Sequence, residues 1–160
     1  MLFRSHWDIY EPVRAHLSEI AQKLKSYGTE VLSIHSVQAP ITDERFRTWG
    51  KEIADFARAL KVKNITLHPN NVNDKVKAQT EACKNLKYFS GFYADEITFC
   101  IETFEGKKRV FSPAQTAAFN LPMTLDTSHV KNQKEVWNLL ENYRQKILTV
   151  HLSARQPGKQ

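Results

Sequence analysis

The sequence contains little cysteine and no long apolar run. Two cysteines, Cys83 and Cys100, are too few for a disulfide framework, which favours a reducing compartment. No apolar run approaches the roughly 18 residues that would span a bilayer. The segment from Met1 to Asp8 is too polar for a signal peptide. We therefore expect a cytoplasmic protein with no membrane partner.

Linkers and low-complexity segments are also lacking. The 160 residues, 41% apolar and 25% charged, are ordinary for a globular domain and exclude a disordered or collagen-like chain. We expect one domain over 1–160 that buries its own core. The net charge of +6 favours acidic partners, either nucleic acid or phosphorylated metabolites. The basic residues are scattered, apart from the run Lys107-Lys108-Arg109 and the pair Lys61 and Lys63, which we interpret as solvated surface. No basic stripe interleaved with aromatic residues is visible.

Helical and strand patterns alternate along the chain. Apolar residues recur at helical intervals, and capping signals mark some helix starts; the predicted helices span about 13–24, 46–60, 73–89 and the segments after Ser112-Pro113 and Asn132. Short β-branched and apolar runs predict strands at 31–35, 64–68, 97–102, 122–126 and 147–151. Successive strands begin 33, 33, 25 and 25 residues apart. This spacing is typical of βα units in a parallel sheet.

Every predicted strand ends in a side chain that can bind a metal ion. These residues are His35, His68, Glu102, Asp126 and His151, and His129 follows three residues after Asp126. The carboxyl ends of parallel strands lie at one edge of the sheet, so these side chains are expected to face one crevice. Unpaired charges there would be costly beside an apolar core, and a divalent cation removes that cost. Imidazole and carboxylate ligands suit zinc, manganese, iron or cobalt better than calcium.

The ordered series of strand ends resembles that of the xylose isomerase-like barrel superfamily. That group holds sugar-phosphate isomerases and epimerases and the endonuclease IV type of apurinic-site nuclease. The matching motifs are Ser33-Ile34-His35-Ser36-Val37, Leu67-His68-Pro69, Cys100-Ile101-Glu102-Thr103-Phe104, Leu125-Asp126-Thr127-Ser128-His129 and Val150-His151-Leu152-Ser153. The resemblance implies an α/β fold, a partial (β/α)₈ TIM barrel with strands two to seven. Strand two would end within 2–7, and the first and last strands would be missing.

The same resemblance implies a set of metal ligands. Glu102 matches the central carboxylate ligand, and Asp126 and His151 match ligands on the two following strands. In the nuclease branch, two further histidines share Glu102 with a second metal and a third histidine binds another; the matching residues are His35, His68 and His129. The implied cofactor is a divalent ion: zinc, manganese, magnesium or cobalt.

Three interpretations of function remain open. The first is a metal-dependent isomerase or epimerase of a small sugar or sugar phosphate, which abstracts a proton next to a carbonyl. Glu102 and His68 would be its catalytic residues, and Arg155 and Asn70 would contact the substrate. The second is an endonuclease IV-like phosphodiesterase acting on apurinic DNA. The third is an inactive truncated barrel that only binds a metal or a partner.

Missing strands would also leave two open sheet edges. Unpaired backbone donors and acceptors along such edges promote association with another strand. A homodimer, in which strands of two copies enclose the core together, is therefore a further expectation.

Overall fold

The structure is a computed structural model that describes residues 16–36, 40–93, 96–104 and 108–152. Its centre is a sheet of five parallel strands, ordered in space as they are along the chain. The strands are β1 (Ser33–His35), β2 (Asn64–Leu67), β3 (Thr98–Glu102), β4 (Met123–Asp126) and β5 (Ile147–His151). This topology confirms the predicted α/β class and the partial TIM barrel. The strand predicted within 2–7 lies outside the described residues.

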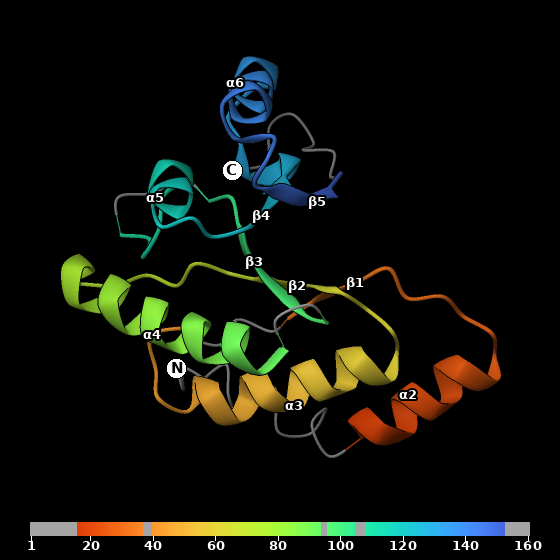
Figure 1. Cartoon of the computed structure of the whole chain (residues 1–160). Helices are drawn as coiled ribbons and strands as arrows, with labels where there is room; N and C mark the ends of the chain where they lie inside the picture. The colour runs from red at the N-terminus through yellow and green to blue at the C-terminus, as the bar shows by residue number, and fades with distance from the viewer. Residues whose placement is uncertain (1–15, 37–39, 94–95, 105–107, 153–160) are drawn as a thin grey trace, which may run out of the picture.

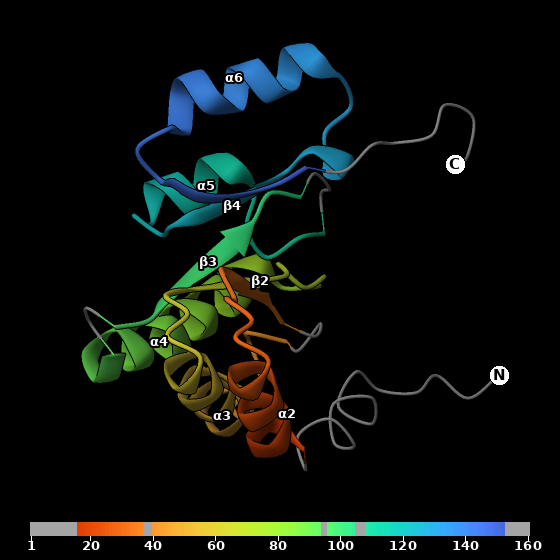
Figure 2. The same ribbon diagram turned by 90° about the vertical axis from the view of Figure 1, so that its right-hand side faces the viewer.

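Helices separate successive strands and cover the outside of the sheet. They are α2 (Leu17–Ser26), α3 (Phe46–Ala59), α4 (Lys75–Tyr93), α5 (Pro113–Ala118) and α6 (Gln133–Tyr143), with the 3₁₀ turn η1 (Thr127–His129) after β4. In Figure 1, α2, α3 and α4 run below the sheet, and α5 and α6 lie above it. In Figure 2 the strands lie between these two groups of helices. No helix among the described residues is long and apolar enough to cross a membrane.

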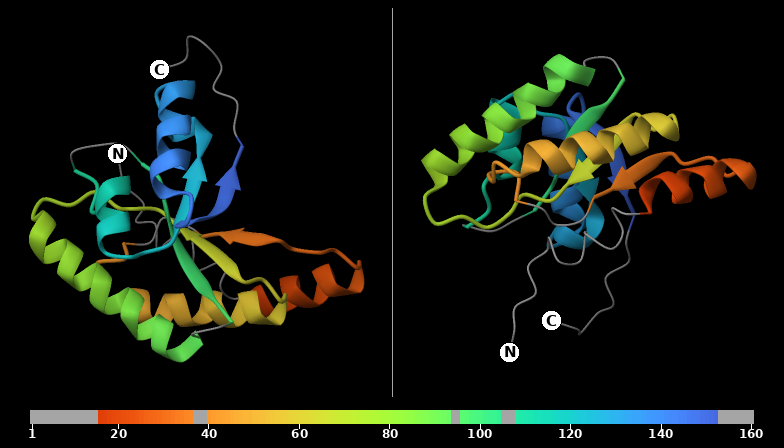
Figure 3. Two further views of the ribbon diagram at one scale, coloured as in Figure 1. Left: turned by 45° about the horizontal axis from the view of Figure 1, so that its top comes forward. Right: turned by 90° about the horizontal axis from the view of Figure 1, so that it is seen from below.

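The sheet is curled into half of a barrel, with the first and last strands turned toward each other. The ring centroids of His35 on β1 and His151 on β5 are only 4.8 Å apart. In a flat sheet, four strand spacings of about 4.8 Å would separate these strands by about 19 Å. Below the rings, Thr66 and Thr124 extend from β2 and β4 and share a buried hydrogen bond of 2.8 Å past the intervening strand. Figure 3 shows how strongly the strand direction changes from β1 to β5.

The main apolar core lies between the sheet and the pair α3 and α4. Phe46 and Trp49 form the inner side of α3, as its helical periodicity predicts, and both are buried. Their partner Phe89 on α4 lies within 5.5 Å of the ring of Phe46 and 5.0 Å of the ring of Phe99. Gly50 allows this approach, because a Cβ atom built there would lie 2.6 Å from Phe89 Cζ. These contacts fix α3 and α4 against the strands that carry the predicted ligands.

Local capping signals agree with the structure at three helix ends. Ser112 and Gln115 form a reciprocal capping box at the start of α5, and the Asn132 side chain accepts a hydrogen bond from Glu135 N at the start of α6. Gly28, just beyond α2, has a φ of +64°, a conformation that favours glycine. The α3 helix begins at Phe46 without a side-chain cap, unlike α5 and α6.

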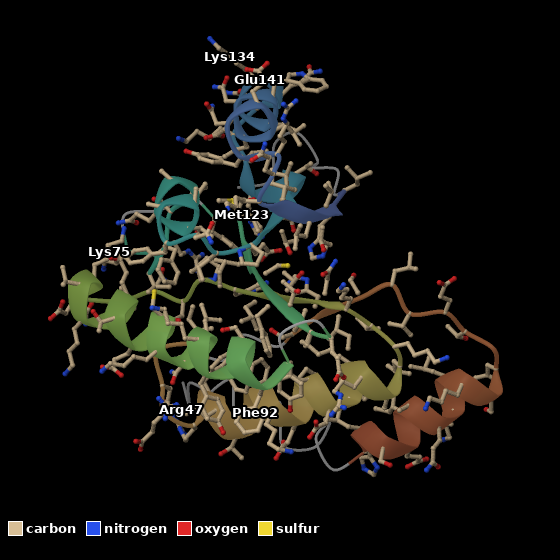
Figure 4. The ribbon with its side chains drawn as sticks, viewed as in Figure 1. Arg47, Lys75, Phe92, Met123, Lys134 and Glu141 are labelled. Carbon is tan, nitrogen blue, oxygen red and sulfur yellow. The ribbon has the colours of Figure 1, made fainter. Side chains whose placement is uncertain are left out.

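The unit formed by α6 and β5 is poorly covered by the rest of the described chain. None of the residues of α6 is buried, and Lys134 and Glu141 extend from it away from the molecule (Figure 4). On β5, Leu148 and Val150 are 50% and 46% exposed. The edge expected to be open is therefore apolar on one face.

Candidate metal centre

The predicted ligand side chains converge on Glu102, the last residue of β3. The Glu102 side chain is fully buried, and three imidazoles surround it. His68 Nε2 lies 2.8 Å from Glu102 Oε2, and His151 Nδ1 lies 3.3 Å from Glu102 Oε1. His35 Nε2 lies 3.7 Å from Glu102 Oε1 and 2.5 Å from His68 Nε2. Four residues from four strand ends thus direct nitrogen and oxygen atoms at one point.

Two buried polar atoms of this cluster lack hydrogen-bond partners within the described part of the chain. Glu102 Oε2 accepts no hydrogen bond, although His68 Nε2 is close, and His68 Nδ1 is also without a partner. A buried carboxylate oxygen left in this state is costly unless a ligand or ion satisfies it. The other atoms of the cluster are paired, since His35 Nε2 bonds to His68 Nε2 and His151 Nδ1 bonds to Glu102 Oε1.

Asp126 and His129 form a second group next to the first. Asp126 ends β4, and both Ser128 N and Ser128 Oγ donate 2.7 Å hydrogen bonds to Asp126 Oδ1. This leaves Asp126 Oδ2 facing His129 Nε2 and His151 Nδ1, each 3.8 Å away. Ser128, which sequence reasoning did not single out, therefore orients the carboxylate.

The surroundings set protonation states that suit metal binding. Burial lowers the pKa of His35, although the charge of Glu102 opposes this effect. Burial likewise lowers the pKa of His129, against the opposing charge of Asp126. For Asp126, burial would raise the pKa, but the hydrogen bonds from Ser128 outweigh it and the net pKa is lowered. Near pH 7 the two imidazoles are neutral and Asp126 is ionised, as metal ligands must be.

The donor atoms form two overlapping groups that fit a divalent cation. Each group offers three ligand atoms within 4.8 Å of one another, and Glu102 belongs to both; the groups are His35, Glu102 and His151, and Glu102, Asp126 and His129. Mixed nitrogen and oxygen donors in this number suit zinc, manganese or cobalt. The unsatisfied Glu102 Oε2 provides a further reason to assign a cation to this position.

The two residues predicted to contact the substrate are placed differently from the predicted metal ligands. Arg155 lies outside the described residues. Asn70 follows β2, and its side chain connects two loops: Oδ1 accepts a 3.2 Å hydrogen bond from Ile41 N, and Nδ2 donates to Thr42 Oγ1 at 3.3 Å. These bonds give Asn70 a role in shaping the rim.

Sequence reasoning missed two residues beside the metal ligands. The ring of Phe104 stacks on that of His129, with centroids 3.6 Å apart. The guanidinium of Arg109 lies over the ring of Phe104, at 4.3 Å from its centroid. Arg109 belongs to the basic run 107–109, which composition alone assigns to solvent. Only its tertiary contacts distinguish it from its neighbours.

Comparison with solved structures identifies the fold. The chain resembles 3-keto-D-glucoside 4-epimerase, YcjR, from E. coli, with a TM-score of 0.71 and 13% identity over 91% of this chain and 68% of that one. For the IolI protein with a binding zinc atom, the TM-score is 0.60 with 15% identity over 91% and 59% of the two chains. For endonuclease IV from Thermus thermophilus, it is 0.55 with 20% identity over 86% and 58%.

These likenesses establish the fold and confirm the resemblance drawn from the strand ends. The chain spans 58% to 68% of the length of these three proteins. No protein-family model and no curated protein matches the sequence. The described strands therefore form part of a TIM barrel, the fold that the chain shares with these proteins.

Proposed function

We propose that this xylose isomerase-like partial barrel is a divalent-metal-dependent isomerase or epimerase of a small sugar or sugar phosphate. The main evidence is the convergence of histidine and carboxylate atoms on Glu102, whose buried Oε2 accepts no hydrogen bond from a described residue. Two of the similar structures support the substrate class, since they are described as a 3-keto-D-glucoside 4-epimerase and a putative sugar phosphate isomerase/epimerase.

We assign separate tasks to the residues of the cluster. Glu102, Asp126 and His151 would hold the cation, which when bound polarises carbonyl and hydroxyl oxygens of the sugar. The Glu102 carboxylate would also accept the proton from the carbon beside the carbonyl. His68 Nε2, 2.8 Å away, would take that proton from Glu102 and return it to the substrate. His35, with a side chain 40% exposed, lies where it would orient substrate hydroxyl groups.

A specific observation favours a second candidate, hydrolysis of a phosphodiester in apurinic DNA. Two donor groups share Glu102, and clustered metal ions can activate water and stabilise a leaving oxygen. The net charge of +6 would assist binding to nucleic acid. The isomerase proposal ranks first because the sequence shows no basic stripe interleaved with aromatic residues that would grip a nucleic-acid backbone.

Metal content and proton exchange test the proposal together. Protein purified without added metal is analysed by plasma mass spectrometry, then incubated in D₂O with a panel of ketoses, aldoses and their phosphates. The proposal predicts bound metal, and deuterium incorporated next to the carbonyl with change of configuration or carbonyl position. Glu102→Gln should abolish both, whereas Glu30→Gln, the same change at an exposed position, should preserve both.

Each contrary result has a definite meaning. Metal without exchange, together with cleavage of a duplex containing an abasic site, would replace the proposal by the second candidate. Metal without either reaction would favour a barrel that only binds. Absence of metal in the wild type, and failure to take it up on dialysis, would refute the metal centre itself.

A further inference from the structure

Two loops are joined at the end of the sheet that carries the metal ligands. The loop after β2 and the loop after β3 meet in a short antiparallel bridge between Asn71 and Arg109. Backbone hydrogen bonds flank it, from Val72 N to Lys108 O at 2.7 Å and from Val110 N to Asn70 O at 2.9 Å. Arg109 is thereby fixed at the rim of the site.

The side chain of Arg109 is held as firmly as its backbone. Its Nη1 donates a 3.2 Å hydrogen bond to Pro69 O, and its guanidinium lies over the ring of Phe104. The same ring stacks on His129, a member of the second donor group, and contacts His68 edge-on at 5.3 Å. The guanidinium is therefore in contact with a ring that itself packs on two predicted metal ligands.

This guanidinium has no anionic partner in the described part of the chain. Arg109 is only partly exposed, yet no described carboxylate forms an ion pair with it. A guanidinium carries five N–H donors, and the hydrogen bond to Pro69 O uses one of them. A positive charge that is partly buried, immobilised and unpaired is a ready site for an anion, and the planar fork matches the oxygens of a phosphate.

We propose that Arg109 binds the phosphate group of the substrate and so selects sugar phosphates over neutral sugars. The inference rests on the proposed isomerase or epimerase function and names its substrate class. Phe104 supports the guanidinium through its ring and links it to His129, on which the same ring stacks. The Arg109 charge is thus available to the remote end of a substrate whose carbonyl end lies at Glu102.

Calorimetric titration of the metal-loaded full chain tests this assignment. The probes are D-ribulose 5-phosphate and D-fructose 6-phosphate, each compared with its unphosphorylated sugar. The wild type should bind at least one phosphorylated sugar about tenfold or more tightly than its neutral counterpart. Arg109→Met should weaken binding of the phosphorylated form by about 10- to 100-fold and leave the neutral form unchanged, and Arg109→Lys should recover part of the loss. Lys108→Met removes the same charge from an exposed neighbour and should change little.

Several results would overturn the inference. Equal affinity for phosphorylated and neutral sugars would refute it while leaving the metal and exchange tests of the proposed function intact. Equal losses in Arg109→Met and Lys108→Met would show an effect of net charge alone. If Arg109→Met lost affinity for the neutral sugar and melted at a lower temperature, the residue would be structural. Binding only of an abasic duplex, weakened by Arg109→Met, would assign the contact to a DNA phosphate instead.

Discussion

Removal of the metal should destabilise the wild type and have no effect on Glu102→Gln. A cation that binds only the folded state adds about 2.7 kcal/mol to the free energy of unfolding when its free concentration is 100 times the Kd. For a chain of this size, each kcal/mol shifts the melting temperature by about 2–4 °C. A chelator should therefore lower the melting temperature of the metal-loaded wild type by about 5–11 °C.

The geometry of Glu102 explains why the variant should not respond. Glutamine keeps the shape of the buried side chain, so the surrounding core is preserved. It removes the carboxylate charge shared by both donor groups, and with it most of the affinity for a cation. The metal-free variant should thus melt no lower than the metal-free wild type, since the substitution removes a buried carboxylate whose Oε2 accepts no hydrogen bond from a described residue.

Differential scanning calorimetry with and without a chelator measures these shifts. Glu30→Gln serves as the control and should respond to the chelator as the wild type does. An equal shift in the wild type and in Glu102→Gln would mean that the metal binds elsewhere. No shift in the wild type after confirmed metal loading would refute the idea that these side chains need a cation.

Three further predictions concern packing, reactivity and association. Gly50→Ala gains about 1 kcal/mol of helix propensity but places a Cβ 2.6 Å from Phe89 Cζ. We therefore expect urea denaturation to show a net loss of up to about 2 kcal/mol in the free energy of unfolding. A higher urea midpoint than that of the wild type would contradict this prediction. Burial raises the pKa of the Cys100 thiol to about 12, so iodoacetamide at pH 8 should label the partly exposed Cys83 first. Peptide mass spectrometry measures the order of labelling, and the reverse order would refute the prediction. The exposed apolar edge at β5 predicts a dimer in sedimentation at micromolar concentration, weakened by Leu148→Lys, and a monomeric wild type would exclude it.

The helices, the strands and the positions of the predicted ligands could be predicted from the sequence, because all of them depend on local patterns. The predicted strand at 147–151 coincides with β5, and the capping box at Ser112 and Gln115 forms as expected. Strand ends share one edge in any parallel sheet, so the meeting of His35 with Glu102 follows once the alternation of strands and helices is recognised. The predicted and observed bounds of β1 agree less well, since the strand begins at Ser33 and the predicted strand begins at residue 31.

The rim of the site could not be predicted from the sequence, because it depends on contacts between distant residues. Asn70 bonds to Ile41 N across 29 positions, and Arg109 reaches Pro69 O across 40. Neither pairing leaves a periodic pattern or a characteristic spacing. The stack of Arg109, Phe104 and His129 likewise depends on the path of two loops, which no local signal specifies.

The order of the sheet has a consequence for how the site is assembled during synthesis. Each strand pairs with the one made just before it, so the sheet can grow one βα unit at a time as the chain leaves the ribosome. His35, His68, Glu102 and Asp126 would already be in place when the nascent chain still lacks β5. The cluster around Glu102 is completed only when His151 arrives on that last strand. Binding of a metal ion by the donor group that includes His151 would therefore report that the final described unit has docked.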